Sequence, residues 1–188
     1  MILFVNACVR DGSRTLRLAE SVLDKLGQEY ESVELGSAQP LPLTGERLAQ
    51  RDRAIAQGDL QADILSYAVQ FARADTIVIA APYWDLSFPS LLKIYTELVC
   101  ACGVTFSYNE KGEPVSLCKA KKLIYVTTAG GFIPERDFGF DYIDTLAKTF
   151  FGIGETVCFK AEGLDIEGND PEAILNKTLD ETDKKLNV

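Results

Sequence analysis

Residues 76–93 read TIVIAAPYWDLSFPSLLK and contain, in order, a strand, a loop and the start of a helix. The first six residues form a nearly continuous apolar run rich in β-branched side chains, which is typical of a parallel strand covered on both faces. Pro82 and Pro89 hold the backbone between them in a narrow range of shapes. Apolar residues at helical spacing follow, namely Leu91, Tyr95, Leu98 and Cys102.

The same strand–loop–helix pattern extends in both directions from this stretch. Strands are predicted at residues 2–7, 30–35, 76–81, 122–127 and 156–161. Helical faces lie between them, and the last helix begins at Asp170-Pro171, an N-cap followed by proline at the first helical position. Alternating βα units predict an α/β protein with a three-layer, flavodoxin-like, doubly wound sheet of five parallel strands. We expect residues 36–58 to form a polar loop with a short helix, and residues 105–117 a hairpin around Lys111-Gly112.

Size and composition limit the possible classes of function. A chain of 188 residues, 47% hydrophobic and 25% charged, predicts a single globular domain over residues 1–188. The net charge of −9 disfavours nucleic acid and membrane surfaces as partners. The N-terminal apolar run, Ile2 to Val5, is too short for a signal-peptide core or a spanning helix, so a cytoplasmic protein is expected.

The cysteine pattern and the absence of histidine argue against several kinds of metal and catalytic site. The five cysteines form an odd set without CxxC spacing, so we expect reduced, mostly buried thiols rather than disulfides or a metal site. Cys100 and Cys102 are expected two residues apart on a helix, where they cannot face one ligand. The absence of histidine excludes Ser-His-Asp and Cys-His triads and the HExxH zinc site.

The loop after the first predicted strand, Cys8 to Thr15, contains donors suited to a phosphate. It offers hydroxyls, guanidinium groups and the N–H groups at the start of a helix near Ser13. The alternative is that Ser13 only caps its helix. The loop matches neither GxxxxGK[ST] nor GxGxxG, which disfavours a nucleoside triphosphatase and a Rossmann dinucleotide site.

Two further loops follow the third and fourth strands of the predicted sheet. The first, from Pro82 to Pro89, carries the only tryptophan and two more aromatic residues, which suit a planar ring but also suit a core or a dimer interface. The second, from Thr127 to Phe132, carries paired glycines that allow close approach of a ligand or simply form a turn. Since the carboxyl ends of parallel strands share one edge, the three loops together predict one ligand with a phosphate and a flat ring.

The order and spacing of these motifs resemble one known family. The residues that carry the resemblance are Ala81-Pro82-Tyr83-Trp84-Asp85-Leu86-Ser87-Phe88-Pro89-Ser90-Leu91-Leu92-Lys93, Gly103-Val104-Thr105-Phe106 with Tyr108, Gly130-Gly131, Phe151-Gly152-Ile153-Gly154 and Ala161-Glu162-Gly163. They are similar to motifs of the flavodoxin-like FMN-dependent NADH azoreductases and NAD(P)H quinone reductases. The resemblance spans most of the chain and is weakest over residues 36–60.

The resemblance implies a cofactor, a co-substrate and a set of binding residues. It implies FMN as cofactor, NADH or NADPH as co-substrate, an aromatic small-molecule acceptor and a homodimer with the flavin at the subunit boundary. The residues that match the family's FMN site are Ser13, Arg14 and Thr15 at the phosphate, Pro82, Tyr83, Trp84, Asp85 and Leu86 along the ring, and Thr128, Ala129, Gly130 and Gly131 at its pyrimidine end. A backbone N–H near Asp85 would face the N5 nitrogen of the flavin.

The chain departs from the family at several of these positions. Asp85 and Leu86 replace an asparagine and an aromatic residue, while Ala129 and Ile133 stand where an arginine and a histidine are common. The predicted activity is ping-pong reduction of quinones, azo or related aromatic compounds, in which the flavin does the chemistry. The sequence identifies no catalytic residue, and the proton donor is water, Tyr83 or Asp85. One alternative is a flavodoxin-like electron carrier that does not oxidise nicotinamide directly, although the T-x-T-G-x-T phosphate loop of such carriers is absent. Another alternative is a binding or regulatory module without flavin.

Overall fold

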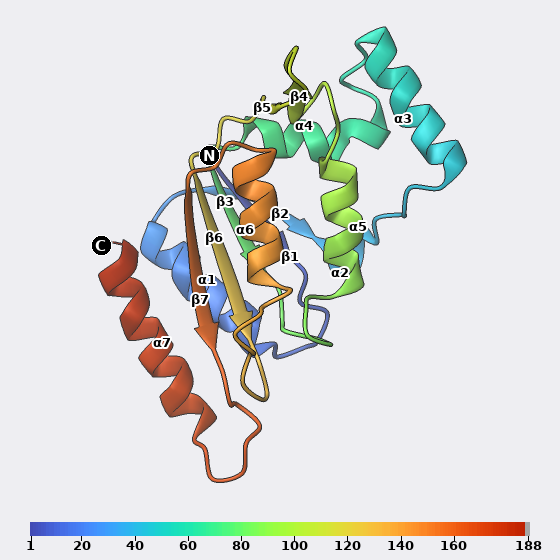
Figure 1. Ribbon diagram of the computed structural model, residues 1–188. Helices are drawn as coiled ribbons and strands as arrows, with labels where there is room; N and C mark the ends of the chain where they lie inside the picture. Colours follow the sequence, from blue (N-terminus) through green and yellow to red (C-terminus); the bar gives the residue numbers. More distant parts are fainter. Residues whose placement is uncertain (187–188) are drawn as a thin grey trace.

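A computed structural model describes residues 1–186, without the side chain of residue 183. Its centre is a parallel sheet with the strand order β2-β1-β3-β6-β7 (Figure 1). The strands are β1 (Ile2–Asn6), β2 (Tyr30–Glu34), β3 (Thr76–Ala80), β6 (Lys122–Thr128) and β7 (Glu155–Ala161). The five predicted strands and the flavodoxin-like order are therefore confirmed.

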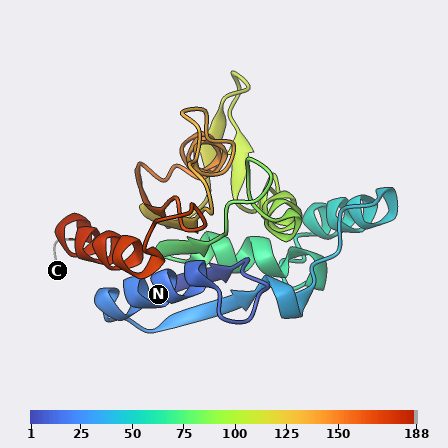
Figure 2. The ribbon, with the colours of Figure 1, turned by 90° about the horizontal axis from the view of Figure 1, so that it is seen from below.

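Helices cover both faces of this sheet, which gives the three predicted layers (Figure 2). One face packs against α1 (Arg14–Leu26) and α7 (Pro171–Leu186) through Leu18, Val22 and Leu175. The other packs against α4 (Ser66–Arg73), α5 (Ser90–Val99) and α6 (Phe140–Thr149) through Phe71, Tyr95 and Ile143. Successive side chains of a strand point to opposite faces, so the inner strands supply both apolar layers at once.

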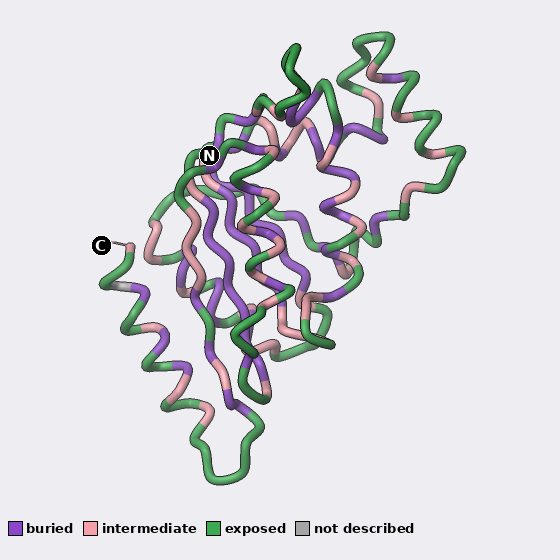
Figure 3. Tube along the Cα trace, viewed as in Figure 1, coloured by how far each residue is buried: buried purple, intermediate pink, exposed green. Residues whose placement is uncertain are grey.

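Burial explains why some strands read as continuous apolar runs. All five residues of β1 are buried, and so are six of the seven residues of β6. Strand β2 lies at an edge and buries only Val33, so its sequence YESVE is mostly polar. Figure 3 shows this contrast between the buried centre of the sheet and its exposed surroundings.

The segment after β2 is more helical than its sequence predicts. It contains α2 (Leu35–Ala38) and a 13-residue helix, α3 (Gly45–Gln57), so the prediction of a polar loop with one short helix was wrong. The Thr44 hydroxyl accepts a hydrogen bond from the Arg47 N–H (3.3 Å), and Gly58 ends α3 at φ 69°. Helix α3 buries only Ala54, which is why it shows a weak apolar pattern.

Two shorter elements complete the fold, a 3₁₀ turn and an antiparallel hairpin. A 3₁₀ turn, η1 (Asp63–Leu65), precedes α4. Strands β4 (Phe106–Tyr108) and β5 (Pro114–Ser116) pair antiparallel, and Gly112 adopts φ 78° in their connection, which confirms the predicted hairpin. Within residues 1–186, no helix is long and apolar enough to cross a membrane.

The cysteines differ in part from the prediction. Helix α5 ends at Val99, so Cys100 and Cys102 do not lie on one helix. The structure contains all five as free thiols, of which only Cys118 is buried and Cys102 is exposed, so the prediction of mostly buried thiols was wrong. Burial raises the pKa of Cys118 and Cys158 to about 12, and that of Cys8 and Cys100 to about 11.

Candidate functional site

A cavity of about 460 Å³ lies at the carboxyl edge of the sheet, where the loops after β1, β3, β6 and β7 meet. This is the edge at which open α/β sheets bind their ligands. The predicted residues that line it are Ser13, Arg14, Thr15, Pro82, Tyr83, Trp84, Thr128, Ala129 and Gly130. Asp85, Leu86 and Gly131 lie beside it without lining it. The three loops singled out in the sequence therefore do surround one space.

The first wall of the cavity is the arginine turn, residues 9–15, which leads from β1 into α1. Gly12 adopts φ 67°, and the Ser13 hydroxyl accepts a hydrogen bond from the Leu16 N–H (3.3 Å). Ser13 is thus the N-cap of α1, and α1 begins where the sequence predicts it. The N–H groups of Arg14 and Thr15, the first two helical residues, have no intrahelical carbonyl partner, which leaves them available to an anion.

Three side-chain contacts attach the arginine turn to the other loops. The buried hydroxyls of Thr15 and Thr128 share a hydrogen bond of 2.6 Å. The Arg14 guanidinium pairs with the Asp165 carboxylate at 2.8 Å. The Arg10 guanidinium lies 5.7 Å from the centre of the Trp84 ring. These contacts fix the walls of the cavity relative to one another.

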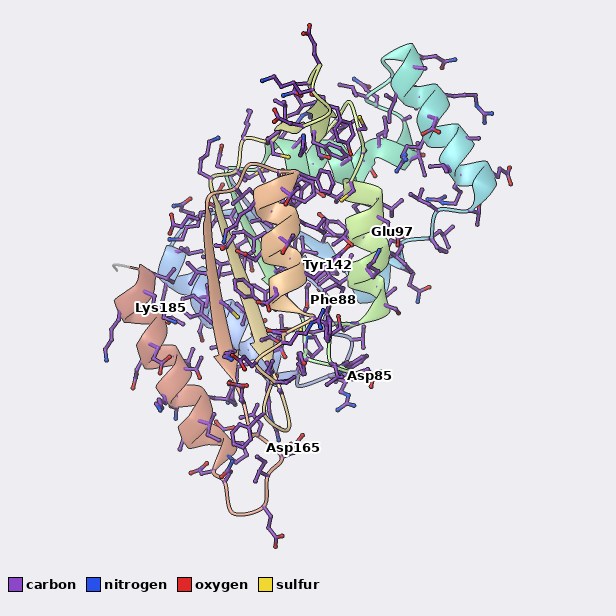
Figure 4. The ribbon with its side chains drawn as sticks, viewed as in Figure 1. Asp85, Phe88, Glu97, Tyr142, Asp165 and Lys185 are labelled. Carbon is purple, nitrogen blue, oxygen red and sulfur yellow. The ribbon has the colours of Figure 1, made fainter. Side chains whose placement is uncertain are left out.

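The second wall is the tryptophan turn, residues 82–87, which follows β3. Trp84 and Ser87 exchange two backbone hydrogen bonds, of 3.0 and 2.8 Å, across Asp85 and Leu86. Asp85 adopts φ 50° and Leu86 adopts φ 66°, a left-handed conformation that is unfavourable for non-glycine residues. This turn presents Tyr83 and Trp84 to the cavity, whereas the Leu86 side chain is 56% exposed. Figure 4 labels Asp85 at this end of the molecule.

Tyr83 carries a buried hydroxyl that has no hydrogen-bond partner among the residues that the structure describes. Its backbone N–H donates to the Thr128 carbonyl at 3.0 Å, which fixes the residue between the second and third loops. Burial, together with the carboxylates of Asp137 and Glu162, raises the pKa of the Tyr83 phenol above its usual value. Tyr83 therefore keeps its proton at neutral pH.

The third wall combines the double-glycine loop with the loop after β7. The N–H groups of Gly163, Leu164 and Asp165 donate to the carbonyls of residues 131, 129 and 130, at 2.8, 3.2 and 2.9 Å. Leu164 and Asp165 also line the cavity and were missed by sequence reasoning. The predicted loop from Cys8 to Thr15 contributes four more lining residues that were not named as site residues: Val9, Arg10, Asp11 and Gly12. The rule that all parallel strands end at one edge would have drawn attention to residues 162–170.

Four other hollows on the described part of the chain are lined by none of the predicted site residues. A larger groove of about 1050 Å³ runs along the edge strand β2, between Glu31, Gln61 and Arg73. Among the described residues, no group of three or more cysteine, aspartate or glutamate side chains is placed to hold a metal ion. The cavity at the carboxyl edge is therefore the candidate site, despite its smaller volume.

Comparisons with known proteins agree with this fold. Residues 1–186 match the family described as flavodoxin-like fold. The FMN-dependent NADH:quinone oxidoreductase of Clostridium beijerinckii is 31% identical over 182 residues, which cover 93% of this chain and 91% of that protein. The FMN-dependent NADH:quinone oxidoreductase 2 of Clostridium acetobutylicum is 43% identical over 122 residues, which are 62% of this chain and only 60% of that protein. The crystal structure of azoreductase from Bacillus anthracis superimposes with a TM-score of 0.83 and 25% identity, over 99% of this chain and 98% of that one.

Proposed function

The chain belongs to the flavodoxin-like fold family, and on that premise we propose that it is an FMN-dependent NAD(P)H oxidoreductase. Its acceptors are quinones, azo compounds or related aromatic compounds. One observation carries the proposal: the three loops converge on one cavity. One wall of the cavity offers hydroxyls, an arginine and backbone N–H groups without an intrahelical partner, and another wall offers aromatic side chains.

The residues present fit FMN. Ser13, Arg14 and Thr15 would hold the phosphate with the N–H groups that begin α1. Pro82, Tyr83, Trp84, Asp85 and Leu86 would lie along the ring, and Thr128, Ala129, Gly130 and Gly131 at its pyrimidine end. The cavity volume of about 460 Å³ falls within the range of about 300–1,000 Å³ that small-molecule sites usually have.

Bound FMN would supply the redox chemistry, accepting hydride from NADH or NADPH and passing two electrons to the acceptor in a second half-reaction. The protein orients both substrates and excludes water from the ring. Water, Tyr83 and Asp85 are the candidate donors of a proton to the reduced acceptor, and Tyr83 belongs to the cavity wall although its hydroxyl is buried. The chain has no histidine to do this.

The test is to load the purified protein with FMN and follow NADH oxidation with menadione as acceptor. Reduction of menadione at the expense of NADH supports the proposal, and the same assay with NADPH gives the coenzyme preference. Bound FMN without nicotinamide oxidation, but with electron exchange with a ferredoxin reductase, would instead identify an electron carrier. A protein that retains no FMN would contradict both functions.

We further propose that a second copy of the chain covers the mouth of the cavity. Four apolar side chains on the cavity's own loops are exposed: Val9 (46%), Leu86 (56%), Phe132 (74%) and Phe138 (48%). All four lie on loops that border the cavity, and exposed apolar surface beside a site is typical of an interface. A solution mass of twice 20.7 kDa would support the homodimer, and a monomeric mass would contradict it. Five unpaired thiols favour a reducing compartment, in keeping with a cytoplasmic location.

A further inference from the structure

Asp165 occupies a defined place at the rim of the candidate cavity. Its Oδ1 accepts a hydrogen bond from the Arg14 guanidinium at 2.8 Å, and its backbone N–H donates to the Gly130 carbonyl at 2.9 Å. Figure 4 labels Asp165 at the end of the molecule where the loops after β6 and β7 lie. The carboxylate is therefore anchored to the third loop on one side and to the arginine turn on the other.

The absence of a side chain at Gly130 makes room for this carboxylate. A Cβ atom at residue 130 would lie 2.4 Å from Oδ2 and 3.1 Å from Cγ of Asp165. The backbone of Gly130 does not adopt a positive φ, so conformational freedom does not require glycine here. A side chain at residue 130 would instead displace the Asp165 carboxylate from its present position.

Stability does not account for the Arg14–Asp165 ion pair. The Arg14 and Asp165 side chains are 41% and 68% exposed, and exposed pairs contribute about 0–1 kcal/mol. The pair does, however, change the charge of the cavity. The charged residues of its lining are Arg10, Asp11, Arg14 and Asp165, which sum to zero. An anion at the start of α1 thus meets an arginine whose charge is already compensated.

From this geometry we propose that Asp165 competes with the flavin phosphate for Arg14 and so weakens the binding of FMN. Asp165 is a specificity-determining residue, because it reduces the advantage of a phosphorylated flavin over riboflavin, which lacks the phosphate. The inference rests on the proposed function. Replacing the carboxylate with an amide leaves the backbone contacts in place and releases the full charge of Arg14 for the phosphate.

The experiment compares the binding of FMN and riboflavin to the flavin-free protein at low ionic strength. For Asp165→Asn we expect the Kd for FMN to fall about fivefold, while the Kd for riboflavin stays within about twofold. Asp165→Ala should behave in the same way, which guards against an effect of the new amide. The double variant with Arg14→Gln should lose the gain, because the effect acts through Arg14.

Glu172→Gln is a matched control. Glu172 of α7 pairs with Arg17 of α1 at 2.8 Å, with side chains 63% and 50% exposed, and neither residue lines the cavity. This variant should bind both ligands as the parent protein does. Unchanged or weaker binding of FMN to Asp165→Asn, or an equal gain for riboflavin, would overturn the role of Asp165 while leaving the proposed function intact. Failure of the parent protein to bind either ligand would overturn the proposed function, and this inference with it.

Discussion

The arginine turn and the tryptophan turn form two walls of one cavity, yet their backbones differ sharply. In the arginine turn, the one residue with positive φ is Gly12, at 67°, and Ser13 caps α1 by an ordinary hydrogen bond. In the tryptophan turn, Asp85 and Leu86 adopt φ 50° and 66° without being glycine. Such residues cost about 1–2 kcal/mol each.

The difference shows which of the two turns indicates a ligand-binding role. The positive φ of Gly12 and the Ser13 cap are also found in turns that bind no ligand, so the sequence pattern of the arginine turn does not separate capping from phosphate binding. The tryptophan turn adopts an unfavourable, destabilising backbone conformation, and neighbouring structure must hold it in place. Ser87 contributes by donating its hydroxyl hydrogen to the Phe138 carbonyl at 3.0 Å.

Thr128→Val should have the largest effect, because it removes the hydroxyl that anchors the arginine turn to β6. The buried Thr15 hydroxyl then loses its 2.6 Å partner, which should lower the free energy of unfolding by about 2 kcal/mol. Urea denaturation measures the change. Thr145→Val is the control, since the Thr145 hydroxyl is exposed and donates only within its own helix. Equal losses in the two variants would show that the anchor contributes nothing.

Ser13→Ala removes the N-cap of α1. We expect a loss of about 1 kcal/mol in the free energy of unfolding, as is usual for capping residues. FMN should also bind more weakly than to the parent protein, whereas riboflavin should not. A loss of stability with unchanged FMN affinity would mean that Ser13 is a cap and nothing more.

Leu86→Gly relieves the left-handed conformation in the tryptophan turn. It should raise the free energy of unfolding by about 1 kcal/mol, because glycine adopts φ 66° without strain. Leu41→Gly is the control, since Leu41 is similarly exposed, at 60%, but has no positive φ. The control should be neutral or destabilising. Destabilisation by Leu86→Gly would contradict the strain assigned to this turn.

The smallest effect should be the loss of stability at alkaline pH that follows from ionisation of Cys8, which directly precedes the arginine turn. Burial raises the pKa of this thiol from 9.0 to about 11 in the folded protein. The unfolded chain therefore ionises first as the pH rises above 9, and stability falls between pH 9 and 11. At pH 9.5 the Cys8 contribution is about 0.8 kcal/mol, so Cys8→Ala should lose less stability between pH 8 and pH 9.5 than the parent protein. Identical pH dependence in the two proteins would contradict the burial of this thiol.

The sequence predicts the sheet because buried parallel strands require apolar runs, and β1, β3 and β6 have them. It also predicts where the loops converge, since every strand ends at the same edge. Helix α3 was missed because it buries a single residue and so lacks an apolar face. Asp165 was missed because its role depends on Gly130, a contact across 35 residues of sequence that no local pattern records.

The central claim is that the carboxyl-edge cavity binds FMN, and the only tryptophan of the chain, Trp84, lies in its wall. The most direct measurement is therefore the fluorescence of Trp84 as the flavin-free protein is titrated with FMN. We predict saturable quenching with one FMN per chain, because a flavin ring in this cavity lies beside the indole. Binding of FMN that leaves the Trp84 emission unchanged, or no binding at all, would contradict the account.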